Sequence, residues 1–189
     1  MATINTNQFK PGVKLLLDGD PYSILENEFV KPGKGQAFNR IKIRNLKNGR
    51  MIEKTLKSGE SVEAADVVDV ELQYLYTDGK DWIFMNEKTY EQISASRESV
   101  GEAVKWLKGQ EKCEVTIWDQ SPISVSVPNF VNLTVLKTDP GLKGDTATGG
   151  TKIAELETGT IVKVPLFVEE GDLLRIDTRN GEYVSRTKE

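Results

Sequence analysis

Hydrophobic and polar residues alternate along several short segments of the chain. Residues 39–46 read NRIKIRNL, residues 70–76 read VELQYLY and residues 160–168 read TIVKVPLFV. Alternation with a period of two, together with β-branched residues, is typical of half-buried strands. Dipeptides that supply the positive φ angles of tight hairpin turns stand between such segments: Asp18-Gly19, Asn48-Gly49, Asp78-Gly79, Gly149-Gly150 and Asn180-Gly181. The pattern predicts a mostly β protein.

One stretch has helical spacing instead. In ESVGEAVKWLKGQ, residues 98–110, apolar side chains recur at Val100, Ala103, Val104 and Leu107, and Gly109 is a suitable stop. We expect one helix here, with its apolar stripe in the core and not in a groove for a partner.

Charge divides the 189 residues into three parts. Residues 1–64 carry 11 basic and 7 acidic side chains, residues 65–128 carry 6 and 12, and residues 129–189 carry 8 and 10. A single uniform domain has little reason for such asymmetry. Strand-turn-strand units of this size favour small barrels or sandwiches. We therefore expect three small barrels in series, with boundaries near Ala65 and Pro128.

Composition excludes several classes of function. The chain has no histidine and one cysteine, Cys113. Ser-His-Asp and Cys-His catalysis, histidine zinc sites and thiolate zinc clusters are therefore excluded. We expect no catalytic residue, no metal and no cofactor, with Cys113 acting as a small buried hydrophobe. With no apolar run of membrane-spanning length and no secretory leader, the expected location is the cytoplasm.

The basic first part has its charge concentrated from Lys31 to Lys57, where nine basic residues meet one acid, Glu53. Period-two alternation along residues 39–45 directs Ile41 and Ile43 inward and three cations outward, namely Arg40, Lys42 and Arg44. A row of like charges favours binding to RNA or another polyanion through its phosphates, and the alternative is a solvated face.

At the edge of this face, FVKPGKGQAF (residues 29–38) places Lys34 between Gly33 and Gly35, downstream of Lys31 and Pro32. The two glycines allow backbone angles that other residues avoid and leave the tip thin, and Pro32 restricts its approach, so we expect the lysine to be able to enter a narrow space. The alternatives are an ordinary turn lysine and a Schiff-base nucleophile, which would need a desolvating pocket.

Two glycine-rich segments resemble nucleotide motifs without matching them. Phe38 replaces the third glycine of a dinucleotide fingerprint, and Gly150 stands where a phosphate-binding loop needs lysine. The segment GDTATGGT, residues 144–151, is expected to be either a plain connection or a donor-rich loop that contacts RNA.

Four longer motifs together resemble bacterial translation elongation factor P: LDGDP, FVKPGKGQAF, DPGLKGDTA, and VKVPLFVEEGD followed by DTRNGEYVSR. They occur in all three parts of the chain. The resemblance implies an SH3-like (KOW-like) barrel at residues 1–64 and OB-fold barrels at 65–128 and 129–189, in an elongated, tRNA-like shape.

The resemblance also implies a function without catalysis. Members of the family bind the ribosome beside peptidyl-tRNA and promote peptide bond formation when consecutive prolines stall synthesis. Lys34 matches a tip lysine that a dedicated lysine-modifying ligase extends with a β-lysyl group in many members. The expected partners of this monomer are therefore the ribosome, peptidyl-tRNA, messenger RNA at the exit site and the ligase.

Position by position, the resemblance implies three further sets of contacts. Arg40, Lys42 and Arg44 would lie along tRNA phosphates. A loop with Gly144, Asp145 and Thr146 would face the exit-site codon, while Tyr183 and Arg186 would lie near the small subunit. The competing hypothesis is a general RNA-binding protein in which the tip is only one contact.

Overall fold

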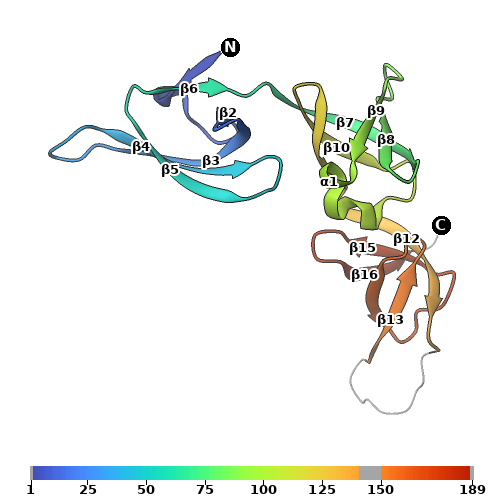
Figure 1. Ribbon diagram of the computed structural model, residues 1–189. Coiled ribbons are helices and arrows are strands. Elements are labelled where there is room, and N and C mark those ends of the chain that lie inside the picture. Colours follow the sequence, from blue (N-terminus) through green and yellow to red (C-terminus); the bar gives the residue numbers. More distant parts are fainter. Residues whose placement is uncertain (1, 141–149, 188–189) are drawn as a thin grey trace. The chain divides into compact units, whose positions relative to one another are not determined.

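A computed structural model describes residues 2–140 and 150–187, which form three antiparallel sheets that follow one another along the chain (Figure 1). The mostly β prediction is confirmed. By its internal contacts the chain divides into two compact units, Met1–Val70 with Val115–Ser124, and Glu71–Glu114 with Val125–Glu189. No helix in the described part of the chain is long and apolar enough to cross a membrane.

The first sheet has six strands in the order β1-β6-β2-β3-β4-β5. Their bounds are β1 Thr3–Asn5, β2 Lys14–Leu17, β3 Asp20–Val30, β4 Phe38–Asn45, β5 Met51–Lys57 and β6 Ser61–Ala64, with a single 3-10 turn, η1, at Thr6–Gln8. One face of the sheet is closed by a compact apolar core: Phe9, Leu15, Leu17, Ile24, Ile41, Ile43, Leu56 and Val62. The inward residues alternate with outward ones along β4, as the period-two pattern predicts.

The middle sheet has the order β11-β10-β7-β8-β9. Its elements are β7 Val67–Thr77, β8 Asp81–Met85, β9 Gln92–Ser96, α1 Arg97–Val100, η2 Gly101–Trp106, β10 Lys112–Trp118 and β11 Ser121–Ser126. Among its buried residues, Tyr74 and Phe84 form an aromatic pair with ring centroids 5.5 Å apart. Strands β7 and β10 each contribute residues to both compact units.

The predicted single helix is shorter and less regular than its apolar spacing indicates. Only Arg97–Val100 is α-helical, and a 3-10 segment follows from Gly101, whose φ is +53°. The left-handed backbone at Gly101 interrupts the α-helix because helical residues need a negative φ. Val100, Ala103, Trp106 and Leu107 are buried, while Val104 is half-buried, so the prediction that this stripe belongs to the core is confirmed.

The third sheet has the order β14-β13-β12-β15-β16. Its strands are β12 Phe130–Thr138, β13 Thr151–Leu156, β14 Ile161–Pro165, β15 Leu173–Asp177 and β16 Glu182–Thr187. Ten buried residues of this sheet and its loops form a core together with Trp106 from η2. Within this unit Thr160 Oγ1 also donates to the carbonyl of Lys105 at 2.8 Å, and Lys108 pairs with Glu157 at 3.2 Å. The 3-10 segment is thus anchored to the third sheet.

Four of the five predicted turn dipeptides lie among the described residues. The glycine has a positive φ in each of them: Gly19, Gly49, Gly79 and Gly181. Gly149 of the fifth lies outside the described residues.

Candidate functional site

The candidate site is built on the hairpin of strands β3 and β4 in the first sheet. The strands pair from Tyr22 with Asn45 to Val30 with Phe38, and residues 31–37 form the tip beyond the last pair. Ile41 and Ile43 have no exposed surface and fix β4 to the core beneath. An apolar anchor on one face leaves the other face and the tip available to a partner.

A pair of amides holds the middle of this hairpin. Asn39, which is almost fully buried, donates from Nδ2 to Asn27 Oδ1 at 2.9 Å, and Asn27 Nδ2 donates to the carbonyl of Phe9 at 3.0 Å. Buried amides are stable only when they are hydrogen-bonded. The chain of amides therefore fixes the position of the hairpin relative to the N-terminal segment.

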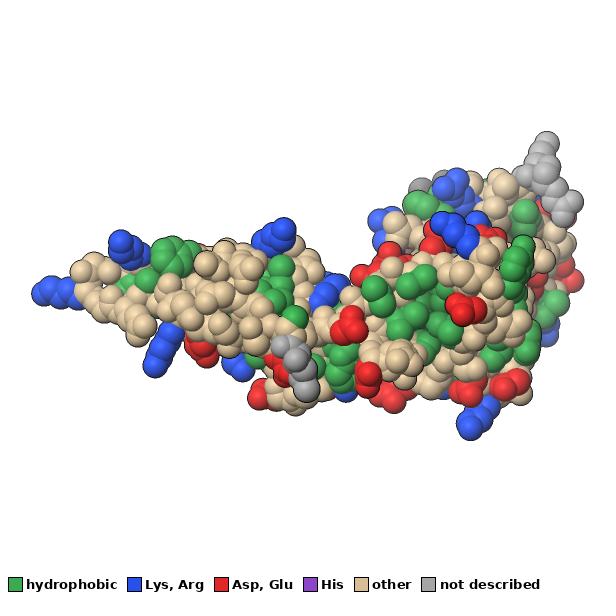
Figure 2. Space-filling view, turned by 90° about the horizontal axis from the view of Figure 1, so that it is seen from above, with side chains coloured by type: hydrophobic (Ala, Val, Ile, Leu, Met, Phe, Trp, Pro, Cys, Tyr) green, Lys and Arg blue, Asp and Glu red, His purple; other side chains and the backbone are tan. Residues whose placement is uncertain are grey.

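The tip is exposed and makes few contacts. Lys34 is exposed and forms no hydrogen bond or ion pair with any described residue, and Lys31 is likewise unpaired within the described part. Figure 2 shows Lys and Arg side chains projecting at the narrow end of the first sheet, where this hairpin ends. The sequence predicts an exposed lysine at the tip of a hairpin, and the position and exposure of Lys34 confirm this.

The two tip glycines differ in how far they use the backbone freedom that glycine allows. Gly35 has φ of +116°, and a Cβ built there would lie 3.7 Å from Cγ of Pro32. Gly33 has no positive φ in this structure and nothing within 4 Å of a built Cβ. Only Gly35 is required by the backbone of the loop.

The outward face of the hairpin is not a row of cations, and this prediction is wrong in part. Arg40 and Lys42 do point outward, but the register places Glu28 opposite Arg40 and Glu26 opposite Lys42. The ion pairs measure 3.6 Å and 3.5 Å, and Glu53 on β5 lies across from Lys42. Counting charges between Lys31 and Lys57 included Glu53 but missed Glu26 and Glu28, because these two belong to the preceding strand, β3.

Two other basic residues of this unit, Lys47 and Lys54, are compensated in the same way, and Arg44 is not. Lys47 contacts Asp20 at 2.7 Å, and this hydrogen bond, followed by one from Asn45, lowers the pKa of the Asp20 carboxyl. Lys54 lies 4.0 Å from Asp18. Arg44 is exposed, with Ser23 and Met51 as its cross-strand neighbours.

The cations left without a carboxylate in the described chain include three near one end of the hairpin. Lys31 and Lys34 belong to the tip, and Lys57 pairs across strands with Phe38, the first residue of β4 after the tip. A polyanion that approaches the tip therefore meets unpaired cations there, as it does at Arg44 near the other end of β4.

The residues predicted to make contacts in the third part of the chain differ in whether the structure describes them and in how exposed they are. Gly144, Asp145 and Thr146 lie outside the described residues. Tyr183 is half-buried and packs against the third core. Arg186 is exposed, pairs with Asp172 at 3.4 Å and lies 5.5 Å from the ring of Phe167.

The sequence reasoning missed one cluster on the third sheet. The guanidinium of Arg175 lies 4.6 Å from the ring centroid of Phe130, and that of Arg179 lies 5.5 Å from it. Their sequence spacing carries no motif, because the cluster forms only when β12 pairs with β15.

Two other kinds of functional site, a reactive thiol and a metal centre, find no support among the described residues. Burial, followed by the charge of Glu111, raises the pKa of Cys113 to about 12, so the thiol stays protonated near neutral pH. In the part of the chain that the structure describes, no three acidic or cysteine side chains are grouped to hold a metal ion.

Comparison with protein-family models assigns the three sheets in order. Residues 5–62 match the elongation factor P KOW-like domain, residues 67–125 its OB domain and residues 131–186 its C-terminal domain. The chain belongs to the elongation factor P family. It is therefore a translation factor with a KOW-like domain followed by OB-like domains, as its motifs predict. The domain boundaries near Ala65 and Pro128 stay predictions.

Solved structures with similar folds carry related names. The chain is 21% identical to eukaryotic translation initiation factor 5A from Methanococcus jannaschii, with a TM-score of 0.52 over 67% of this chain and 92% of that one. It is 15% identical to a translation initiation factor eif-5a family protein from Naegleria fowleri, with a TM-score of 0.54 over 67% of this chain and 98% of that one. At such identities the similarity concerns the fold.

Proposed function

We propose that this elongation factor P family member binds the ribosome beside peptidyl-tRNA and promotes peptide bond formation at consecutive prolines. The observation that carries the proposal is the position of Lys34, exposed on a hairpin tip that the core and the amide pair hold from below. The domain order of the family supports a role in translation.

The mechanism needs no catalytic side chain. Proline is a conformationally restricted nucleophile, so its reaction is sensitive to the orientation of the peptidyl-tRNA end. Holding that end in a reactive geometry lowers the barrier by removing orientational disorder in advance. A cationic arm that contacts the phosphates of the acceptor end provides such positioning.

We further propose that a ligase acylates the Lys34 amine with a β-lysyl group. The exposed tip supports this, because a modifying enzyme reaches a loop amine more readily than one held along a strand. The added group would lengthen the arm while keeping a terminal cation.

The remaining contacts of the proposal follow the family motifs. Arg40 and Lys42 would meet tRNA phosphates, which requires their ion pairs with Glu28 and Glu26 to open or to be shared. Gly144, Asp145 and Thr146 would face messenger RNA at the exit site, and Tyr183 and Arg186 the small subunit. A single chain suffices for all of these contacts.

The test uses cells whose own copy of this factor has been removed. They express the parent, Lys34→Arg, or the matched control Lys31→Arg, together with a polyproline reporter and a reporter lacking prolines. Arginine keeps the charge but offers no amine for acylation, so Lys34→Arg should bind ribosomes almost as well as the parent and fail on the polyproline reporter. Lys31→Arg should resemble the parent.

A second measurement separates modification from charge. Mass spectrometry of the protein purified from its native host should find a covalent addition on the Lys34 peptide and on no other lysine peptide. If Lys34→Arg restores polyproline synthesis fully, the tip acts through charge alone and the β-lysyl proposal is wrong. If neither reporter responds to loss of the whole protein, a general RNA-binding role replaces the proposed one.

A further inference from the structure

The third sheet carries a cation that no carboxylate compensates. Arg175 lies on β15, is exposed and forms no ion pair with any described residue. Its cross-strand neighbours are Asn132 on β12 and Ser185 on β16, both uncharged. On a chain with net charge −4, an unpaired and ordered guanidinium is a feature that needs a reason.

The ring of Phe130 orders this guanidinium. Phe130 is the first residue of β12, 40% of its surface is exposed, and Arg175 lies 4.6 Å from the ring centroid. A guanidinium over an aromatic ring is attracted by the charge distribution of the ring. Stacking uses the flat face of the guanidinium, so its N–H groups stay available for a ligand with two acceptor oxygens.

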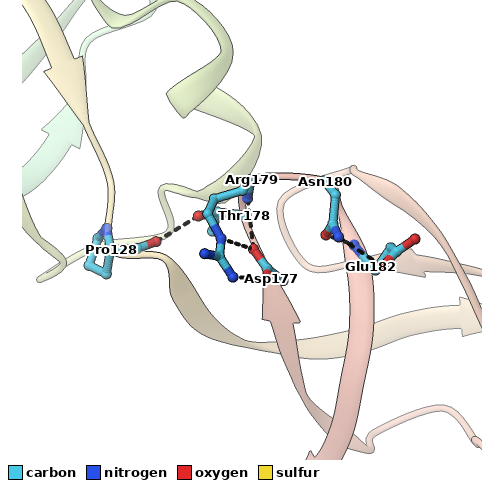
Figure 3. Close-up of polar contacts among 6 residues, drawn as sticks. All are labelled: Pro128, Asp177, Thr178, Arg179, Asn180 and Glu182. Atoms are coloured by element: carbon cyan, nitrogen blue, oxygen red, sulfur yellow. Dashed lines mark hydrogen bonds and ion pairs between the residues drawn. The ribbon is translucent and has the colours of Figure 1, made fainter. Parts of the chain in front are cut away.

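Arg179 plays a different part in the cluster. It donates from Nε to Asp177 Oδ1 at 2.9 Å and also pairs with Oδ2 at 2.5 Å, so its charge is neutralised (Figure 3). These hydrogen bonds lower the pKa of Asp177 and raise that of Arg179. Asp177, the buried carboxylate that the described residues contain, is thereby occupied and does not compete for Arg175.

The turn that carries Arg179 is itself fixed. Thr178 Oγ1 donates to the carbonyl of Pro128 at 2.7 Å, and Asp177 Oδ1 accepts from the backbone of Arg179 at 3.0 Å (Figure 3). Pro128 lies two residues before Phe130, and Phe130 pairs with Asp177 across strands, so these contacts join the start of β12 to the turn. The cluster is preorganised and loses little conformational freedom on binding.

We propose that Arg175, stacked on Phe130, is a phosphate-binding contact for RNA on the third sheet. Its neighbours favour RNA over a protein partner, because Asn132 and Ser185 supply hydrogen-bonding groups at positions where a protein interface core would place apolar side chains. The contact rests on the ribosome binding of the proposed function, and it adds a site away from the Lys34 hairpin.

The test measures binding of the full chain to ribosomes purified from the native host, at several KCl concentrations. The variants are Arg175→Gln and Phe130→Leu, and Lys163→Gln is the control because Lys163 is an exposed cation on β14 of the same sheet. Circular dichroism verifies that each variant is folded.

Arg175→Gln should weaken binding by about tenfold or more, as expected for a lost hydrogen bond to a charged group. It should also reduce the slope of log K against log salt by about one, because one fewer phosphate is neutralised. Phe130→Leu should weaken binding by about threefold without changing net charge, since the guanidinium loses its stacking partner. Lys163→Gln should change affinity less than about twofold if its charge is merely solvated.

Equal effects of Arg175→Gln and Lys163→Gln would overturn the proposal. A loss of affinity with an unchanged salt slope would also overturn it and would assign the cluster to a protein contact. The outcome is separate from that of the polyproline reporter, which depends on Lys34. Failure of the Arg175 proposal can therefore be distinguished from failure of the proposed function at Lys34.

Discussion

The tip of the first hairpin and the strands that carry it differ in how many contacts their side chains make. In β3 and β4 the inward side chains are buried, the amides of Asn27 and Asn39 are hydrogen-bonded, and two outward cations, Arg40 and Lys42, are paired with acids. In the tip, Lys34 is exposed and unpaired among the described residues.

This difference separates stability from function within one hairpin. Residues whose contacts hold the strands contribute to the free energy of unfolding, whereas tip residues that touch nothing contribute almost none. Substitutions in the two regions should therefore change different observables. Four predictions test this separation, ordered from the largest expected effect on stability to the smallest.

Removing buried volume from β4 should have the largest effect. Ile41→Ala deletes apolar atoms from a side chain with no exposed surface and should cost about 3 kcal/mol of unfolding free energy. Amide hydrogen exchange of the β4 peptide measures this loss at the strand that carries the substitution. Ile52→Ala on β5, where the side chain is 36% exposed, is the control and should cost clearly less. Equal costs would mean that the core beneath the hairpin is loosely packed.

Breaking the amide pair should have the next largest effect. Asn39→Ala removes a buried amide and leaves the half-buried Asn27 Oδ1 acceptor without its donor, so it should cost about 2 kcal/mol. The same hydrogen exchange measurement applies, with Gln36→Ala in the exposed tip as a control that should change nothing. Increased exchange in the Phe9 segment should accompany the loss, because Asn27 also bonds the carbonyl of Phe9.

These two effects depend on features that sequence reasoning found to different degrees. Alternation predicted the inward positions of Ile41 and Ile43 because side-chain direction along a strand is a local property. It did not predict the amide pair, because the pairing of Asn27 with Asn39 depends on the register of β3 against β4. A bulge between Ile24 and Glu26 sets that register, and the bulge has no clear sequence signal.

The same reason explains the error on the cationic face. The sequence shows nine cations and one acid from residue 31 to residue 57, but strand pairing brings in Glu26 and Glu28 from outside that window. The cluster of Arg175 with Phe130 was missed for the same reason. By contrast, the tip lysine was found from sequence because Pro32, Gly33 and Gly35 stand next to it in the chain.

The two tip glycines offer a sharper version of the comparison. Gly35→Ala should cost about 1 kcal/mol, since its φ of +116° is unfavourable for a residue with a Cβ. Gly33→Ala should cost almost nothing, because a Cβ there meets open space. Thermal unfolding of the two variants should distinguish them, and an equal shift would contradict the backbone assignment. If Gly33→Ala folds normally yet impairs polyproline synthesis, the glycine keeps the tip thin for its partner.

Neutralising the acids of β3 should have the smallest effect on stability and an opposite effect on binding. The double variant Glu26→Gln and Glu28→Gln breaks two exposed ion pairs, each worth well under about 1 kcal/mol. It also frees Arg40 and Lys42 to meet phosphates and removes two negative charges beside them. Ribosome affinity should therefore rise by severalfold, with a steeper dependence on salt, because more counterions are released on binding.

The converse variant completes this test. Arg40→Glu with Lys42→Glu should lower affinity and flatten the salt dependence, while leaving the fold intact because both side chains point outward. If the two double variants bind alike, the middle of the hairpin is only a solvated support, and binding through the first sheet depends on the cations near the tip. If their affinities differ in the expected directions, Glu26 and Glu28 lower the affinity of the strands for RNA by competing with phosphates for Arg40 and Lys42. In that case Lys31 and Lys34, which pair with no acid among the described residues, would meet phosphates without such competition.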